Sequence, residues 1–457
     1  MNATAGALPF QGQQVINYKR AFVFAVTAYM LVSMARIHEI VPQLGPLRLG
    51  MLTGMIAIAT AVSAIRKDIL SSILASPVTK GLAVVVLFAV LTMPTGVWPK
   101  ASFNYLSRTY YNALLLFVLT AAVFADRRAA RVIITALVAD VALAGMYALL
   151  RSAPGRYEMG YTYDANETAS LFVMTVPWAI YLLLTEKGLP RWLGMAALPV
   201  CAIGLLKTGS RGGLLSAMAL VPFLLVLAPP KRRAQFTLLV VAGALVTALS
   251  MGEQAVFRLR KAFDTTEYNY TTRDGRMEIW KRGVSYIKGS PLLGVGIDGF
   301  QYKELQSKKN EGFGVRQAAA HNMYIQVAAE LGLIGFGGFL AMLFGGQYSC
   351  VLARRRAKLA ISRGGGPEAE RDLLRANMAQ ASLFSLMCSG FFLSLGYSAM
   401  VYFASAVPIG VAMMGHGGGT PGRPIETVPQ ARLRGMRGWR SSRPVPAGFH
   451  GMSTPQQ

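Results

Sequence analysis

The chain has 457 residues, of which 53% are hydrophobic and only 15% are charged, and its mean hydropathy is +0.41. Soluble domains carry charges on nearer a quarter of their residues, so this composition excludes a soluble globular protein and predicts an all-α, polytopic membrane protein. The three cysteines show neither CxxC nor Cys/His spacing, which argues against a disulfide framework and a zinc site.

A membrane-spanning helix needs roughly 20 predominantly apolar residues. About twelve stretches approach this length, and the first of them predicts an uncleaved span that serves as its own insertion signal. The candidates are residues 19–36, 48–65, 79–94, 109–125, 131–150, 166–185, 191–207, 211–228, 234–251, 328–350, 376–396 and 398–415.

These stretches divide the chain into five parts. A short N-terminus is followed by nine helices, one large and partly helical loop, three more helices and a basic tail. The Gly, Pro and Arg content of the tail predicts disorder. The boundaries are 1–18, 19–250, 251–327, 328–415 and 416–457.

The distribution of Lys and Arg predicts the orientation. With the N-terminus in the cytoplasm, about 26 of the 46 basic residues lie in cytoplasmic segments, about 8 in short outer loops and about 12 in the large loop. Both termini are therefore expected in the cytoplasm. Long loops are exempt from the charge rule, so the 251–327 loop is expected outside, in the periplasm of a Gram-negative cell.

The net charge of +25 is explained mainly by this topology and by contact of the tail with anionic lipid headgroups. Nucleic acid is not an expected partner. The cations of the outward loop are not needed for orientation, and they indicate an anionic ligand such as a lipid-linked phosphate or pyrophosphate.

Two short motifs open spans on the outward face. Asp164 begins the sixth span, where its carboxylate would orient a substrate or cap the helix. Arg211 lies in Lys207-Thr208-Gly209-Ser210-Arg211-Gly212-Gly213, at the junction of two spans. A charge at this boundary snorkels, pairs or serves a site, and the small residues beside it would leave room for a ligand.

Inside the large loop, residues 271–274 fit a capping box that starts a helix. Arg273, Arg276 and Trp280 then follow at i, i+3 and i+7, on one helical face. Two guanidinium groups and an indole suit a phosphate with an adjacent sugar. The same pattern also fits a helix at the membrane interface. The next segment, 290–296, reads as a helix stop and a glycine turn.

His321 ends the loop and opens the next helix. A neutral imidazole accepts a proton from a hydroxyl near pH 7, which is the task of a general base, although an isolated histidine is also often structural. Asn322 would orient a substrate or cap the helix.

Taken in order and spacing, these motifs resemble the O-antigen ligase and Wzy-type polymerase superfamily. The resemblance covers about residues 205 to 350, with a similar loop at Asp164-Ala165-Asn166-Glu167. The motifs are Ser210-Arg211-Gly212-Gly213, Arg273-xx-Arg276-xxx-Trp280, Pro291-Leu292-Leu293-Gly294-Val295-Gly296, Ala320-His321-Asn322-Met323-Tyr324 and Glu330-Leu331-Gly332-Leu333-Ile334-Gly335.

The resemblance implies a bacterial inner-membrane glycosyltransferase. It would take a glycan from undecaprenyl diphosphate and pass it, with inversion, to a hydroxyl of lipid A core, of a growing chain or of another surface acceptor. Arg211, Arg273 and Arg276 would hold the diphosphate and His321 would be the base. Trp280, Asn322 and Asp164 are the weaker candidates for contact with the sugar. No cofactor is implied, and without an Asp-x-Asp or an outward carboxylate cluster no metal is expected.

Three functions remain open from the sequence. A ligase attaches finished glycan, and the long loop with its terminal His-Asn favours it. A polymerase joins repeat units on the carrier. A transporter or flippase of lipid-linked sugars performs no chemistry, and Pro177, Pro199 and Pro222 inside spans would suit its broken helices.

Overall fold

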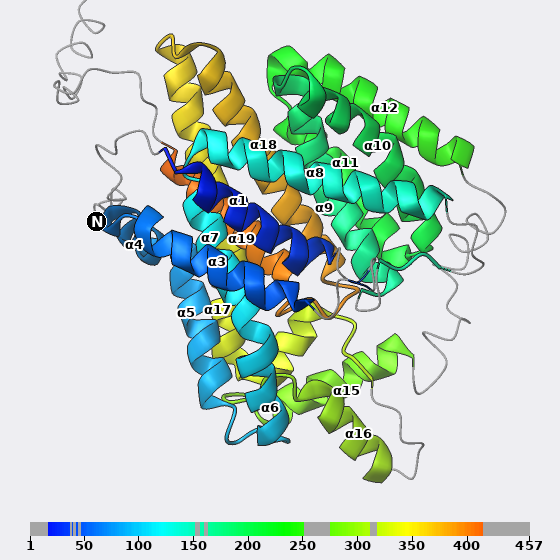
Figure 1. Ribbon diagram of the computed structural model, residues 1–457. Coiled ribbons are helices and arrows are strands. Elements are labelled where there is room, and N and C mark those ends of the chain that lie inside the picture. Colours follow the sequence, from blue (N-terminus) through cyan, green and yellow to red (C-terminus); the bar gives the residue numbers. More distant parts are fainter. Residues whose placement is uncertain are drawn as a thin grey trace, which may run out of the picture. The chain divides into compact units, whose positions relative to one another are not determined.

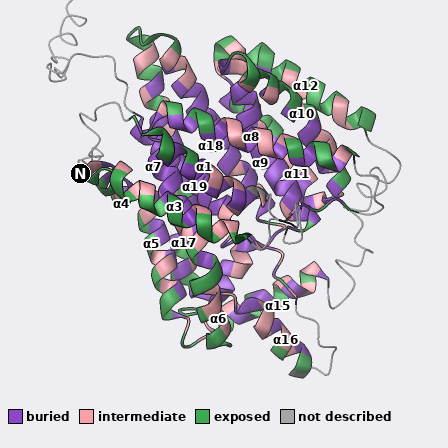
Figure 2. Ribbon diagram, viewed as in Figure 1, coloured by how far each residue is buried: buried purple, intermediate pink, exposed green. Residues whose placement is uncertain are grey.

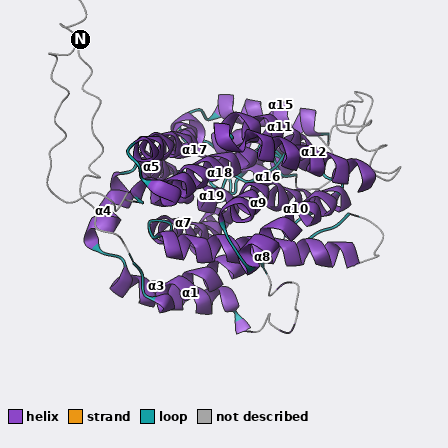
Figure 3. Ribbon diagram, turned by 90° about the horizontal axis from the view of Figure 1, so that it is seen from above, coloured by secondary structure: helices purple, strands orange, loops and turns teal. Residues whose placement is uncertain are grey.

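The computed structural model describes residues 17–36, 39, 43, 47–150, 156–159, 163–250, 275–310 and 318–414. Within these ranges every element is a helix, and none is a strand (Figures 1 and 3). Arg273, the 271–274 capping box and the predicted disordered tail at 416–457 lie outside the described residues.

The helices follow one another with short connections. In chain order they are α1 (Arg20–Met30), η1 (Leu31–Ala35), α3 (Leu49–Ala64), α4 (Lys67–Ala75), α5 (Pro77–Leu91), α6 (Pro99–Tyr105), η3 (Leu106–Tyr110), α7 (Tyr111–Val123), α8 (Arg127–Leu150), α9 (Ala165–Thr185), α10 (Leu189–Thr208), α11 (Arg211–Leu227), η4 (Pro230–Arg232), α12 (Arg233–Ser250), α15 (Arg276–Gly289), α16 (Phe300–Asn310), α17 (Met323–Ser362), α18 (Gly366–Ser389) and α19 (Ala399–Met413).

Each of the twelve predicted stretches falls on one of these helices, and the all-α, polytopic class is confirmed. Six helices of the described chain are long and apolar enough to cross a membrane, or seven if the bent pair α3 and α4 forms one span. Four apolar helices are shorter. The exact number of spans stays a prediction.

The helix α18 differs from its predicted bounds of 376–396, because it begins at Gly366 and ends at Ser389. Its first half carries charges that are paired inside the bundle. Buried Arg375 pairs with Asp372 and donates to the Tyr181 hydroxyl at 2.6 Å, while Arg127 donates to Asp372 at 2.7 Å. Neighbouring helices therefore compensate these charges, which makes a polar helix tolerable in the interior.

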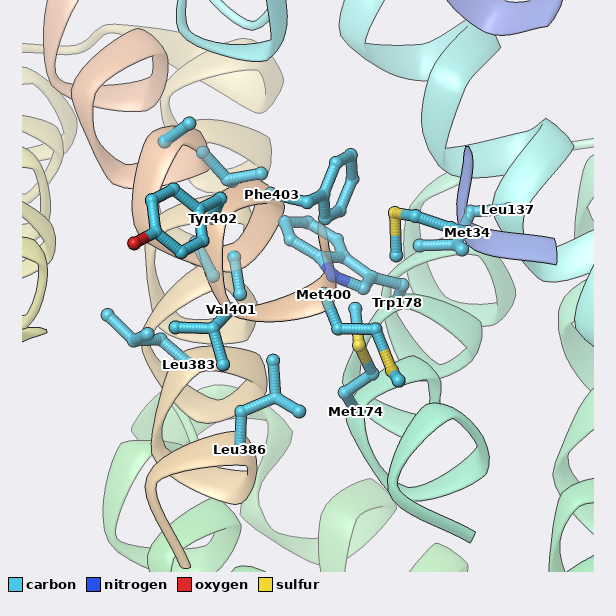
Figure 4. Packing of buried hydrophobic residues seen from close by; sticks show 14 of the residues in the cluster. Met34, Leu137, Met174, Trp178, Leu383, Leu386, Met400, Val401, Tyr402 and Phe403 are labelled. Carbon is cyan, nitrogen blue, oxygen red and sulfur yellow. The ribbon is translucent and has the colours of Figure 1, made fainter. Parts of the chain in front are cut away.

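Helices α9, α18 and α19 form the buried centre, whereas α3 and α12 present mostly exposed apolar side chains (Figure 2). Figure 4 shows this core around Trp178, with Met400 and Phe403 of α19 nearby. The indole of Trp178 donates to Ser382 Oγ at 3.2 Å, so its polar atom is satisfied. Exposed apolar faces at the periphery suit contact with lipid.

The long helix α17 is broken at Gly332, whose φ of 68° and ψ of −179° are conformations open essentially to glycine alone. A break in a buried helix frees backbone groups that must find new partners. The turn after α15 supplies them. Val295 N–H donates to Ala329 O at 2.8 Å, Gly296 N–H donates to Glu330 O at 3.0 Å, and Leu333 N–H donates to Pro291 O at 2.7 Å.

This docking also sets the position of α15. The helix runs parallel to the first segment of α17, because Trp280 reaches Ala320, Gly283 lies against Ile325, and the turn at 291–296 meets the break. Figure 1 shows α15 and α16 at the same end of the structure as α6. The predicted glycine turn is thus confirmed, and its role is to complete the broken helix.

An ion-pair cluster joins α15 to α16. Arg282 donates to the fully buried Glu304 at 2.8 and 3.0 Å, and Lys308 approaches the same carboxylate at 4.0 Å. Exposed Lys281 pairs with Glu278 of its own helix. The cations next to Arg276 in the sequence therefore hold the two helices together or cover the surface.

Substitution of Gly332 by Ala should destabilise the protein. The new Cβ would overlap the Leu292 carbonyl and the left-handed φ would be strained, so we expect a loss of about 2 kcal/mol or more. The temperature at which half of the purified protein aggregates in detergent measures this. Gly337→Ala is the matched control, because nothing lies near its Cβ position and Ala favours a helix. Equal loss in both variants would contradict the account of the break.

Substitution of Arg282 by Gln should leave buried Glu304 without its main cation and cost about 3 kcal/mol of stability. Lys281→Gln removes a pair whose lysine is 70% exposed and should cost about 0.5 kcal/mol or less. The same thermal measurement compares them. An Arg282→Gln protein of normal stability would show that this ion pair does not hold α15 and α16 together.

Candidate functional site

His321 lies two residues before α17, not inside it, and its backbone is left-handed with a φ of 49°. Two contacts hold it. Its N–H donates to Ser394 Oγ at 2.9 Å, and the carbonyl of the preceding Ala320 accepts from Trp280 Nε1 at 3.0 Å. The imidazole itself is half-buried.

Asn322 and Trp280 have structural roles in this arrangement. The Asn322 side chain caps α17 by accepting from Tyr324 N–H at 2.9 Å and Ile325 N–H at 3.1 Å, which is one of the two roles predicted for it. The Trp280 N–H is engaged with the backbone beside His321. Contact of either side chain with a sugar stays a prediction.

Arg211 is the first residue of α11, and Ser210 is its N-cap. The sequence suggested that the glycines after it leave room for a ligand, but neighbouring side chains fill that room. A Cβ on Gly212 would lie 2.6 Å from Phe392 Cβ, and one on Gly213 would lie 2.5 Å from Ala169 Cβ. The small residues are therefore needed because the first turn of α11 packs tightly against its neighbours.

Asp164 caps α9 through a complete capping box with Glu167, the structural role predicted for it. Its carboxylate also accepts from the Asn166 side chain at 3.1 Å. The Asn166 oxygen in turn accepts from Ser210 Oγ at 2.9 Å and from an Arg156 guanidinium nitrogen at 2.7 Å. This network joins the start of α9, the start of α11 and the segment before α9.

Several of these groups lie close enough to affect one another's pKa. Burial lowers the pKa of Arg276, Arg156 and Arg211 lower it further, and Asp164 opposes them. Burial also lowers the pKa of His321 below its usual range, with a contribution from Arg276 and opposition from Asp164. Arg276 thus interacts with two other guanidinium groups, with the Asp164 carboxylate and with the His321 imidazole, and the charge around it is predominantly positive.

The structure therefore brings together Arg211, Arg276, Asp164 and His321, which lie far apart in the sequence. Arg273 falls outside the described residues. The helix α15 begins at Arg276 after an extended Gly275, so Arg276 and Trp280 lie on one helix, and the part of the predicted face that includes Arg273 stays a prediction.

Sequence reasoning missed Arg156 and Ser394. Arg156 precedes α9 and donates to Thr208 O at 2.9 Å, so it also closes the C-terminal end of α10. A signal for it was its place in the same outward loop as Asp164. Ser394 belongs to the loop after α18, although the sequence predicts a span at 376–396 that would include it. The described residues contain no group of three His, Cys, Asp or Glu side chains arranged to hold a metal ion.

Comparison with known proteins finds similarity over the part of the chain that contains several of these residues. The family model described as O-Antigen ligase matches residues 195–340, which include Arg211, Arg276 and His321. An uncharacterized protein of Haemophilus influenzae is 23% identical over 249 residues, covering 49% of this chain and 61% of the relative. The exopolysaccharide production protein ExoQ of Rhizobium meliloti is 27% identical over 206 residues, covering 42% of this chain and 44% of the relative.

Less than two thirds of either relative's length is covered, so their similarity concerns part of each protein. The family match falls on the region in which the motifs were recognised. The predicted resemblance to the O-antigen ligase and Wzy-type polymerase superfamily is thereby confirmed, and the similarity to the O-antigen ligase family falls on residues 195–340.

Proposed function

We propose that the chain is a membrane glycosyltransferase that moves a glycan from undecaprenyl diphosphate to an acceptor hydroxyl. The observation that carries this proposal is the position of Arg276, which interacts with Arg156, Arg211 and Asp164 and also with His321. The O-antigen ligase match supports it, because the residues that the resemblance assigns to the diphosphate and to the base, Arg211, Arg273, Arg276 and His321, lie within the matched region. The site would face the periplasm of the inner membrane, with both chain termini in the cytoplasm.

The chemistry needs two separate groups. The acceptor oxygen attacks the anomeric carbon, the bond from that carbon to the diphosphate oxygen breaks, and undecaprenyl diphosphate leaves with the bonding electrons. Guanidinium groups that hold the diphosphate stabilise the charge that develops on it. His321 takes the acceptor proton on the opposite side, which gives inversion at the anomeric carbon.

The environment of His321 suits a base. Since its pKa lies below the usual range, the imidazole is neutral at pH 7 and able to accept a proton. Arg276 serves both purposes, because it favours the neutral imidazole and supplies positive charge for the diphosphate. Asp164 limits how far the cations suppress protonation of His321.

Ligation to lipid A core is the first candidate reaction, and polymerisation of lipid-linked repeat units is the second. The similarity to ExoQ, a protein named for exopolysaccharide production, favours the second. A transporter is less well supported. Pro177, Pro199 and Pro222 lie within helices that continue through them, and the break in α17 is at a glycine, Gly332.

The first test is deletion of the gene, complemented with wild type or His321→Ala, followed by gel analysis of surface and carrier-linked glycan. We expect His321→Ala to behave as the deletion does, because it lacks the base. A lost ligase leaves full-length polymer on the carrier, whereas a lost polymerase leaves single repeat units. Normal surface glycan with an equal amount of His321→Ala protein in the membrane would contradict the assignment of the base.

The second test is the pH profile of kcat/KM, measured with carrier-linked glycan extracted from the deletion strain. The active form is the neutral imidazole, so activity is present above the pKa of His321 and falls as the pH drops through it. The wild-type acid limb should lie below about 6.5.

Arg276→Gln removes a cation that lowers this pKa, so its acid limb should move to higher pH. Arg211→Gln is the matched control, because Arg211 is not among the groups that shift the pKa of His321. An acid limb at the wild-type pH in Arg276→Gln would show that Arg276 does not lower the pKa of His321.

A further inference from the structure

The loop between α18 and α19, residues 390–398, contacts both halves of the proposed site. On one side Ser394 Oγ accepts from His321 N–H at 2.9 Å, and Gly390 O accepts from Met323 N–H at 2.7 Å. On the other side Phe392 packs against Gly212, the residue after Arg211. The loop lies about 70 residues after His321 in the chain and outside the matched family region.

The backbone of His321 needs such a contact. A left-handed φ is unfavourable for a residue with a side chain, and it persists only where the surroundings hold it in place. The hydrogen bond to Ser394 holds the residue itself, and the bond from Trp280 to Ala320 O holds the residue before it. The direction of the imidazole follows from this backbone.

Helix stability does not explain the Ser394 contact. The start of α17 is capped by Asn322, and the start of α19 is capped by Ser398, whose hydroxyl accepts from Met400 N–H at 3.3 Å. The hydroxyl of Ser394 is thus not needed for either cap. Its contact bears on the conformation of His321.

We propose that Ser394 is a positioning residue for His321, and that the 390–398 loop fixes the base relative to Arg211. This inference rests on the proposed function. Ser394 acts through the backbone of His321 and takes no part in holding the diphosphate. Its loss therefore lowers the rate of the chemical step and leaves donor binding unchanged.

The test compares kcat and KM of purified variants with carrier-linked glycan extracted from the deletion strain. We expect Ser394→Ala to lower kcat about fivefold to tenfold, the effect of one lost hydrogen bond at the base, with KM unchanged. Ser394→Thr keeps the hydroxyl and should stay within about twofold of wild type. Ser398→Ala is the matched control in the same loop and should keep the wild-type kcat.

A double variant separates positioning from general damage. The residual kcat of His321→Ala, measured at high enzyme concentration, should not fall further when Ser394→Ala is added, because a residue that acts only through His321 has nothing left to position. A further loss, a rise in KM at unchanged kcat, or a normal kcat in Ser394→Ala while His321→Ala is inactive would overturn the role of Ser394 alone. Full activity of His321→Ala would instead remove the proposed base, and the positioning role with it.

Discussion

The break in α17 is the constraint on which the rest of the site depends. A helix interrupted inside the bundle must satisfy its freed backbone groups, and here the turn at 291–296 satisfies them. Because that turn directly follows α15, docking it at Gly332 places α15 beside the first segment of α17. Arg276 at the start of α15 is thereby brought near His321 at the start of α17. One set of main-chain hydrogen bonds thus turns a polar loop into one wall of a site.

The other wall comes from the starts of α9 and α11, which precede α15 in the sequence. Asn166 accepts hydrogen bonds from Ser210 and Arg156, and so joins the starts of α9 and α11 to the segment before them. Arg211 follows Ser210 directly, and its turn is packed so closely that only glycines fit after it. Asp164, Arg211 and Arg276 therefore each stand at the start of a helix that is fixed by a cap, a neighbouring helix or both. Such rigidity is what a site for charge stabilisation requires, since its dipoles and cations are in place before the reaction.

Much of this could be predicted from the sequence. Each of the twelve stretches chosen by hydropathy falls on a helix, and the order of the motifs identified the superfamily and singled out Arg211, Arg276 and His321 as candidates. Contacts across the bundle could not be predicted. The span at 376–396 was misplaced because the charges of α18 look unsuited to an interior helix until Arg127 and Tyr181 are seen beside them.

Gly212 and Gly213 seemed to make room for a ligand, whereas Phe392 and Ala169 occupy that room. Arg156 and Ser394 belong to none of the recognised motifs, and the contacts that involve them are seen only in the fold.

The central claim is a division of labour, in which arginines hold the diphosphate and His321 takes the proton. Isothermal titration calorimetry in detergent, which measures the affinity of purified variants for undecaprenyl diphosphate, tests it most directly. The account predicts that His321→Ala binds this lipid as tightly as wild type, while Arg211→Gln and Arg276→Gln bind it about tenfold or more weakly, as expected for the loss of a charge-assisted contact. Equal affinity in all four proteins, or weak binding only in His321→Ala, would contradict it.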